Sequence, residues 1–182
     1  MTGNRHGEER GIIPRSVEEL LRNARTMQSQ GWEIELSVSI VEIYNEDIRD
    51  LLAKPTPNAA FTVNNNSNKE KSEKIKIGRQ NGRVVVSGLT TVPIYVGATE
   101  SSCQSYDDST AMQQFYEVFN QSMEARSTAS TGMNELSSRS HLIVMIDVSA
   151  TLTTVTQGTS TMTLTGGLRL CDLAGSERLD RT

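Results

Sequence analysis

The sequence has few aromatic residues, only two cysteines, no long apolar run and no excess of positive charge. Aromatic residues make up 4% of its 182 residues, so a core would be built mainly from aliphatic side chains. No apolar run approaches the roughly 18 residues of a membrane-spanning helix, and the first residues are too polar for a signal peptide. We therefore expect a cytosolic protein that does not enter a membrane.

Charge and cysteine content narrow the class further. A formal net charge of −4 argues against a general nucleic-acid-binding protein, which would carry a basic surface. Cys103 and Cys171 allow at most one disulfide, and Cys171 lies in an apolar strand pattern where a buried free thiol is expected. A buried free thiol favours a reducing compartment. The shares of hydrophobic residues, 36%, and charged residues, 22%, suit one globular domain or part of one.

The N-terminal part of the chain predicts a helix followed by a strand. The capping-box spacing of Ser16 with Glu19 predicts the helix start, and the helix should end near Gly31. From Glu35 to Tyr44, apolar residues occupy both alternating phases, which predicts a strand covered on both faces. The apolar face of the helix consists of Val17, Leu20, Leu21 and Ala24.

The middle of the chain predicts a solvated loop and a small hairpin. A short helical turn at residues 48–52 leads into residues 54–73, whose prolines, asparagines and mixed charges predict a flexible loop insertion. Residues 74–77 and 83–86 flank a turn-rich segment and predict a hairpin, to which residues 90–95 add a third strand.

The C-terminal half predicts an amphipathic helix and two long strands. From about Asp107, apolar residues recur with helical spacing, and we expect the resulting stripe to pack in the core. Residues 142–148 predict a strand and residues 162–171 its return, with a bulge or bend at Gly166–Gly167. The two strands should form an antiparallel pair that brings two polar loops to the same end of a sheet. The stripe consists of Met112, Phe115, Tyr116, Phe119 and Met123.

Two polar motifs carry the functional signal: Asn-Glu-Leu-Ser-Ser-Arg-Ser-His at residues 134–141 and Asp-Leu-Ala-Gly-Ser-Glu at residues 172–177. The first has too many hydrogen-bonding groups to be buried without partners, so it should face a polar ligand or cleft. The second fits a phosphate-and-magnesium arrangement, because a strand-end carboxylate can hold a metal-bound water and a glycine amide can approach a phosphate. Asp-x-x-Gly alone is common by chance. Paired with Arg139, whose ion-pair partner would be an acid such as Glu177, it predicts a two-switch nucleotide site.

The first motif resembles the N-x-x-S-S-R-S-H first switch of the kinesin motor domain, and the second resembles its D-L-A-G-S-E second switch. The resemblance extends to residues 11–15, 41–46 and 50–52 and covers nearly the whole chain. Residues 178–182 resemble most the C-terminal-motor, minus-end-directed kinesins. The resemblance implies an α/β fold, a partial kinesin-type P-loop NTPase with a central β-sheet flanked by helices, in which residues 1–182 are the central part of a single motor domain.

The resemblance also implies ATP and Mg²⁺ as cofactors of the full-length parent and assigns roles to the first motif. Ser138 would ligate the magnesium ion and approach the terminal phosphate, and Ser137 would help to place the attacking water. Asn134 would contact the phosphate region. In the second motif, Asp172 would hold the magnesium ion through water.

The remaining implied roles concern the switch itself. Gly175 would donate its amide to the γ-phosphate, and Arg139 with Glu177 would form a latch that closes when ATP is bound. His141 is expected to start a strand without a catalytic role. Tyr44 is expected to pack, and Glu42 to lie at the surface.

One motif that the family needs is missing. The chain has no Gly-Lys dipeptide, so the G-x-x-x-x-G-K-[ST] loop that cradles the phosphates is absent. In the family, that loop lies shortly before the segment matched by the first residues here, and most of the microtubule contact follows the second switch. We therefore expect the chain to lack the phosphate-loop strand and helix and the C-terminal microtubule-binding helices. By itself it should neither hydrolyse ATP nor move.

The implied partners are microtubules or tubulin and ATP, in the cytoplasm and its microtubule cytoskeleton, with a coiled coil outside this chain as a route to dimers. The main alternative is a non-enzymatic truncated remnant that at most binds tubulin or another protein through residues 74–92. The matching serines with Arg139 and Glu177 favour the motor, because a decayed motor has no reason to keep them. A two-switch GTPase is disfavoured, since the serine-rich first switch is not the usual GTPase form.

Overall fold

The computed structural model describes residues 10–53, 75–80, 82–96, 108–128, 139–155 and 159–175. The loop predicted at residues 54–73 lies outside these ranges. No helix within them is long and apolar enough to cross a membrane. In chain order the elements are α1 (Ile12–Ser29), β1 (Trp32–Tyr44), β2 (Asp47–Asp50), β3 (Lys76–Gln80), β4 (Arg83–Ser87), β5 (Val92–Ile94), α2 (Asp108–Thr128), β6 (His141–Val155) and β7 (Thr159–Asp172).

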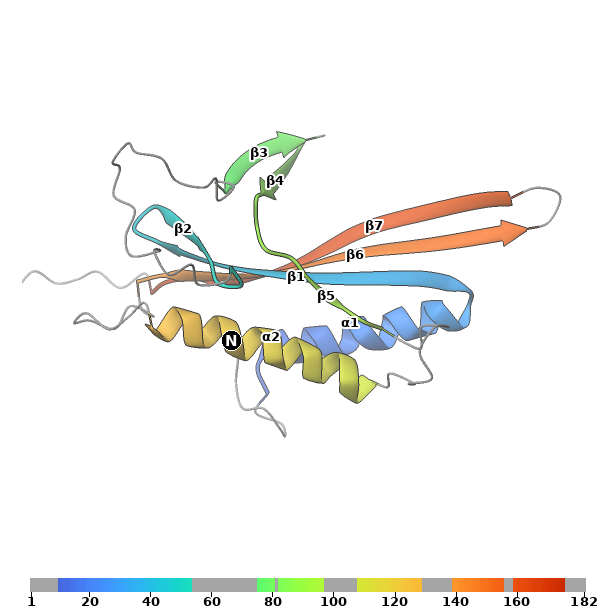
Figure 1. The fold of residues 1–182 in the computed structure, drawn as a ribbon, viewed down its shortest axis with the longest axis horizontal. Helices are drawn as coiled ribbons and strands as arrows, with labels where there is room; N and C mark the ends of the chain where they lie inside the picture. The colour runs from blue at the N-terminus through green and yellow to red at the C-terminus, as the bar shows by residue number, and fades with distance from the viewer. Residues whose placement is uncertain are drawn as a thin grey trace, which may run out of the picture.

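The described residues form a five-stranded antiparallel sheet in the order β2–β1–β6–β7, with β5 also paired to β1. Helices α1 and α2 cover the same face of this sheet, below it in Figure 1. Because neighbouring strands run in opposite directions, β1 ends, β6 starts and β7 ends at one end of the sheet, on the left in Figure 1. This end of the sheet is called the switch end below.

The main core lies between the helices and the sheet. The amphipathic stripe predicted for α2 is confirmed, since Phe115 and Phe119 are buried and their ring centroids lie 5.8 Å apart. Strand β1 is buried continuously from Val38 to Glu42, which confirms the prediction that both of its faces are covered. Alternate strand residues face the helices and join the core: Leu36, Val38 and Ile40 of β1 and Leu142, Val144 and Ile146 of β6.

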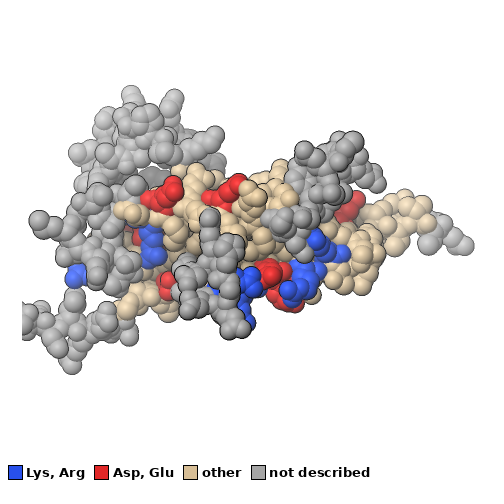
Figure 2. Space-filling view, turned by 90° about the horizontal axis from the view of Figure 1, so that it is seen from below, with Lys and Arg blue, Asp and Glu red and all other residues tan. Residues whose placement is uncertain are grey.

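Helix α1 begins earlier than the capping-box spacing predicted. Its N-cap is Gly11, and Ser16 lies inside the helix. Pro14 is tolerated there because it lies in the first turn, where the backbone N–H groups have no partner within the helix. Figure 2, which looks at the molecule from below, shows acidic and basic side chains next to each other on this face. Residues of α1 take part in two ion pairs, Arg10–Glu18 and Arg22–Glu19.

The helical turn predicted at residues 48–52 is wrong, because Asp47–Asp50 forms strand β2 against β1. Asn45 and Glu46 connect the two strands, and both have positive φ angles, 50° and 68°. Two successive positive φ angles are typical of a type I′ hairpin turn, whose twist matches that of the strands it joins. The turn therefore decided this element, and the apolar spacing of the following residues did not.

The hairpin predicted around residues 78–82 is confirmed as β3 and β4, which form a separate two-stranded sheet. Its turn is shorter than predicted, because Gln80 already pairs with Arg83. The third strand predicted at residues 90–95 exists as β5, but it pairs with β1 in the main sheet, with Leu36 opposite Ile94.

The ladder between β6 and β7 advances one residue for one residue from Leu142↔Asp172 to Val155↔Thr159, so the bulge predicted at Gly166–Gly167 is not present in it. A glycine at position 167 is explained by the space around it. A Cβ on it would lie 2.7 Å from Arg169 Nη1 and 2.9 Å from Asp147 Oδ1. The glycine therefore leaves space for the ion pair of Arg169 with Asp147, at 2.5 Å.

Cys171 is a free and exposed thiol, so the prediction of a buried one is wrong. Leu170 faces the core, and the strand alternation places its neighbour Cys171 on the opposite face of β7. Leu170 is the buried residue of this strand, and Met162 and Leu164 in the same phase are about half exposed, so the apolar pattern of β7 does not correspond to a buried strand. The expectation of a reducing compartment was based on a buried thiol, so the structure does not support it.

Candidate functional site

The described parts of the two polar motifs meet at the switch end of the sheet. The first motif reaches β6 through Arg139, Ser140 and His141, and the second begins at Asp172, the last residue of β7. Leu142 pairs with Asp172, so the motifs lie on adjacent strands. The prediction that an antiparallel pair brings both motifs to the same end of a sheet is confirmed.

Three of the predicted site residues are placed by the structure. Arg139 is exposed in a turn before β6, Asp172 is half-buried, and Gly175 is exposed. Their implied roles stay predictions, as does the latch between Arg139 and Glu177. The other predicted site residues lie outside the described residues: Asn134, Ser137, Ser138 and Glu177.

His141 connects the two motifs directly. The backbone N–H of Ala174 donates a hydrogen bond to His141 Nδ1 at 2.9 Å. The bond joins the first residue of β6 to the residue before Gly175. The amide of Gly175 is the group predicted to donate a hydrogen bond to the phosphate. A ring nitrogen that accepts a hydrogen bond carries no proton, so this contact also fixes Nδ1 as the unprotonated nitrogen. The sequence predicted only that His141 starts a strand, and this second contact was missed.

Glu42 is buried, so the prediction that it lies at the surface is wrong. It is 1% exposed and follows Val38 and Ile40 in the same phase of β1, which places it on the helix-facing side. Arg126, near the end of α2, donates from Nε to Glu42 Oε1 at 3.2 Å. Arg49 Nη1 lies 3.6 Å from the other oxygen, within ion-pair range but too far for a hydrogen bond. The burial of this carboxylate is compensated by two facing cations.

Arg126 also reaches the end of the first motif. Its Nη2 donates to Ser140 Oγ at 2.8 Å and to the Ser140 backbone oxygen at 3.3 Å. Ser140 is itself buried, 1% exposed. One guanidinium therefore bridges a buried carboxylate on β1 and the residue that precedes β6. We call Glu42, Arg126 and Ser140 the arginine bridge.

The arginine bridge and Asp172 share one face of the sheet. Glu42 pairs with Leu142, and Leu142 pairs with Asp172, so the three residues form a row across β1, β6 and β7. With strands spaced about 4.8 Å apart, the backbones of the two acidic residues are about 10 Å apart. The strand phase of Glu42 was the signal that could have revealed this arrangement from sequence.

The described side chains at the switch end suit a Mg²⁺ ion that is also bound by phosphate, but they do not form a complete metal site by themselves. Among the described residues, no group of three His, Cys, Asp or Glu side chains could hold a metal ion. Magnesium commonly uses one or two carboxylates together with waters and phosphate oxygens, and the Asp172 carboxylate at a strand end fits that pattern. Two hollows of about 1080 and 1090 Å³ in the described part are lined by neither Arg139–His141 nor Asp172–Gly175. Neither hollow is therefore the candidate site.

Comparison with known proteins gives one consistent family. The family model described as "Kinesin motor domain" matches residues 1–182. Kinesin-like protein KIN-14D of Arabidopsis thaliana is 35% identical over 175 residues, which are 96% of this chain and 20% of that protein. Carboxy-terminal kinesin 2 of Xenopus laevis is 31% identical over 172 residues, which are 94% of this chain and 22% of that protein. The predicted likeness to C-terminal-motor kinesins is thereby confirmed.

A solved structure of a fast kinesin superposes on the chain with a TM-score of 0.67 and 32% sequence identity. The match covers 100% of this chain and 42% of that one, so the architecture described above is part of a kinesin motor fold. The chain spans about a fifth of the length of the curated relatives it matches.

Proposed function

This chain belongs to the kinesin motor domain family, and on that basis we propose that residues 1–182 are the central part of one motor domain of P-loop NTPase type. Its full-length parent couples ATP hydrolysis to movement along microtubules and acts on the microtubule cytoskeleton. The similar fast kinesin was described in terms of its ATPase mechanism and its interactions with microtubules, and we extend both to the parent of this chain. The observation that carries the proposal is the meeting of Arg139–His141 with Asp172–Gly175 at the switch end.

In this proposal the first motif binds the terminal phosphate of ATP. Ser138 ligates Mg²⁺ and approaches the phosphate, Ser137 orients the attacking water, and Asn134 contacts the phosphate region. Asp172 holds the magnesium ion through water, as its strand-end position and half-buried carboxylate allow. Bound Mg²⁺ supplies charge neutralisation at the phosphate oxygens.

The second motif senses the same phosphate. Gly175 donates its amide, because a residue without a side chain lets the backbone approach the phosphate closely. Arg139 and Glu177 form the latch that closes over bound ATP. The hydrogen bond from Ala174 to His141 supports this arrangement, because it holds the residue next to Gly175 against the start of β6.

The 182 residues alone should not turn over ATP. They contain no Gly-Lys dipeptide and therefore no lysine-bearing phosphate loop, which would supply much of the energy that binds ATP. We expect purified chain to show no ATP turnover above a blank, with or without microtubules. Microtubule-stimulated turnover by this chain alone would contradict this part of the proposal.

The motor assignment itself is tested on the longest in-frame gene product that contains residues 1–182. That product should contain a G-x-x-x-x-G-K-[ST] loop and hydrolyse ATP with a kcat of about 1–100 s⁻¹ when microtubules are present. Ser138→Ala should lower kcat by about 100-fold or more, because it removes a contact to the transferred phosphate. Ser160→Ala, an exposed serine on β7, is the matched control and should leave kcat unchanged. A product without turnover, or one indifferent to Ser138→Ala, overturns the assignment.

A second candidate function is binding without catalysis. The β3–β4 hairpin is a separate sheet with exposed apolar side chains, Ile77 and Val84, next to exposed Lys76 and Arg79. Such a surface suits docking onto tubulin or another protein. Co-sedimentation of the 182-residue chain with microtubules in the absence of nucleotide tests this candidate, and a chain that stays in the supernatant excludes it for microtubules.

A further inference from the structure

A buried carboxylate at the switch end has no role in the proposed chemistry. Glu42 is 1% exposed, and its Oε2 accepts no hydrogen bond within the described part of the chain. Burying a charge in this way is costly unless nearby groups compensate it, so its position calls for a reason beyond packing. The reason lies in what its hydrogen-bonded partner, Arg126, does with its remaining donors.

Arg126 joins two residues that are far apart in the sequence, since it lies 84 positions from Glu42 and 14 positions from Ser140. Its Nε faces Glu42, while its Nη2 faces both the hydroxyl and the backbone oxygen of Ser140. A planar guanidinium presents its donors in a fixed fork, so anchoring one side of it on Glu42 sets the direction of the other. The end of α2 and the start of β6 are thereby held to one point on β1.

Ser140 lies between Arg139, the predicted latch residue, and His141, which accepts the Ala174 amide. Fixing Ser140 therefore fixes the chain direction on both sides of it. Leu142, two residues further on, lies between Glu42 and Asp172 in the row across the strands. The arginine bridge therefore lies beside both motifs: it contacts Ser140 of the first directly, and through Leu142 it shares a row of the sheet with Asp172 of the second.

We propose that Glu42 and Arg126 are positioning residues for the switch end, acting through Ser140 to hold Arg139 and His141 in register with Asp172 and Gly175. Arg49 compensates the Glu42 charge without contacting Ser140, so it takes no part in the positioning. The significance for nucleotide chemistry rests on the proposed function, whereas the positioning itself is a property of the 182-residue chain.

The test compares three variants of the 182-residue chain by hydrogen exchange without nucleotide. Arg126→Met removes the bridge, and amide exchange at His141 and Leu142 should rise by about tenfold as the start of β6 opens. Exchange at Val144–Ile146, in the middle of the strand, should stay unchanged. Arg49→Met is the matched control, since it removes the other cation near Glu42. It should leave exchange at His141 and Leu142 within about twofold of the unmodified chain, compared with the rise of about tenfold expected for Arg126→Met.

Arg126→Lys separates positioning from charge compensation. A lysine keeps a positive charge beside Glu42, but its single ammonium cannot hold Glu42 and Ser140 with the geometry of a guanidinium fork. We expect a urea unfolding midpoint close to that of the unmodified chain together with raised exchange at His141 and Leu142. A role in charge compensation alone would leave both quantities unchanged.

Two results would overturn the proposal. One is unchanged exchange at His141 and Leu142 in both Arg126 variants. The other is an equal rise in Arg49→Met, because the charge around Glu42 would then matter and the contact with Ser140 would not. If Arg126→Met fails to fold, Ser140→Ala decides: it removes the Oγ acceptor alone and should raise the same exchange by about threefold, with no rise counting against the proposal.

A second arm keeps this inference distinguishable from the proposed function. In the longest in-frame product, Arg126→Lys should lower kcat/KM for ATP by about tenfold, because the site is held less well in its productive geometry. A product without ATPase activity contradicts the proposed function but leaves the exchange result standing. Raised exchange with unaltered kcat/KM confines the positioning to the fold and removes it from the nucleotide site.

Discussion

The two ends of the sheet treat polar and apolar side chains in opposite ways. At the switch end, Glu42 and Ser140 are each 1% exposed and are held by Arg126. Away from the switch end, apolar Leu164 of β7 is 50% exposed, and Val155, at the far end of the β6–β7 hairpin, is 77% exposed. Hydropathy alone would predict the reverse at both ends.

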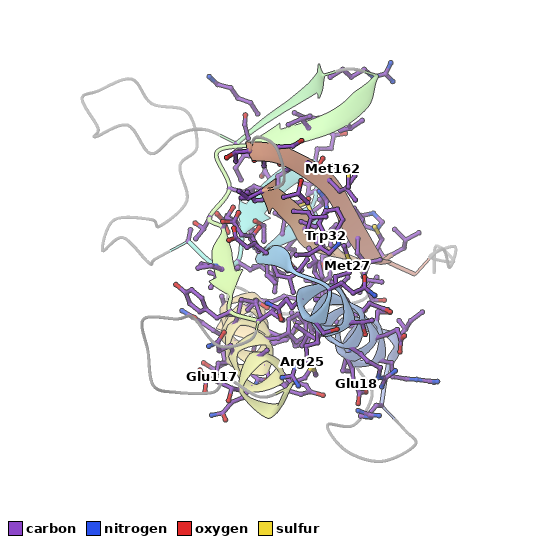
Figure 3. All side chains as sticks on the ribbon, turned by 90° about the vertical axis from the view of Figure 1, so that its right-hand side faces the viewer. Glu18, Arg25, Met27, Trp32, Glu117 and Met162 are labelled. Atoms are coloured by element: carbon purple, nitrogen blue, oxygen red, sulfur yellow. The ribbon has the colours of Figure 1, made fainter. Side chains whose placement is uncertain are left out.

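The difference comes from what covers each end. At the switch end, α2 delivers Arg126 onto the sheet, whereas the hairpin extends beyond α1 on the right in Figure 1. Strand β1 begins at Trp32, opposite Leu152, which itself pairs with Met162 (Trp32 and Met162 are labelled in Figure 3). Among the described residues, no third strand pairs with the hairpin past this row. Burial therefore depends on which elements pack against each end of the sheet. The polar groups buried at the switch end are held there by specific hydrogen bonds.

The largest expected difference between the two ends is in apolar packing. Leu142→Ala, at a position 1% exposed, should lower the free energy of unfolding by about 4 kcal/mol, because it leaves a cavity under the helices. Leu164→Ala, on the exposed hairpin, should change it by less than about 0.5 kcal/mol. Urea unfolding followed by circular dichroism measures both. Similar losses would mean that the hairpin is packed as tightly as the switch end.

The next difference is in ion pairs. Glu42→Ala should cost about 3 kcal/mol of unfolding free energy, because it leaves the largely buried Arg126 without its carboxylate. Glu18→Ala removes the partner of Arg10 at the surface, where a partly exposed pair contributes about 0–1 kcal/mol. The two variants are compared by their urea midpoints. An equal effect would show that burial of Glu42 adds nothing to its pair.

The smallest difference concerns one hydrogen bond at each end. His141→Phe keeps a ring but removes the acceptor of the Ala174 amide, and should cost about 1 kcal/mol of unfolding free energy. Thr154→Val removes a long hydroxyl contact, 3.4 Å, to the Ser160 oxygen on the exposed hairpin and should cost almost nothing. If thermal unfolding gives the same shift for both, the His141 contact does not hold the two motifs together.

Much of the fold was predictable because the long elements have strong periodicity. The stripe of α2 and the alternation in β1 and β6 were assigned correctly, since each spans enough residues for one period to dominate. Strand β2 was missed because its evidence was the pair of positive φ angles at Asn45 and Glu46, and neither residue is a glycine. Short elements depend on turn conformation, which residue types specify only loosely.

The sequence predicted the motifs of the candidate site but not the residues that hold these motifs in place. The sequence identified Arg139, Asp172 and Gly175 by their pattern, and the structure places them at one end of the sheet. It assigned Glu42 to the surface because an acid is usually solvated, although its phase matched that of the core residues before it. A charged residue in the core phase of a strand indicates a buried pair, whose partner cannot be named until the helix is packed.

The sequence by itself determined the family, the alternation of the strands and the order in which the two motifs follow one another, because these depend on residue types and spacing along the chain. Only the tertiary structure decided that Arg126 bridges Glu42 and Ser140 and that Ala174 bonds to His141. The reason is physical: these contacts join residues 84, 14 and 33 positions apart, and such pairings exist only once α2 is packed against the sheet and β7 has returned beside β6.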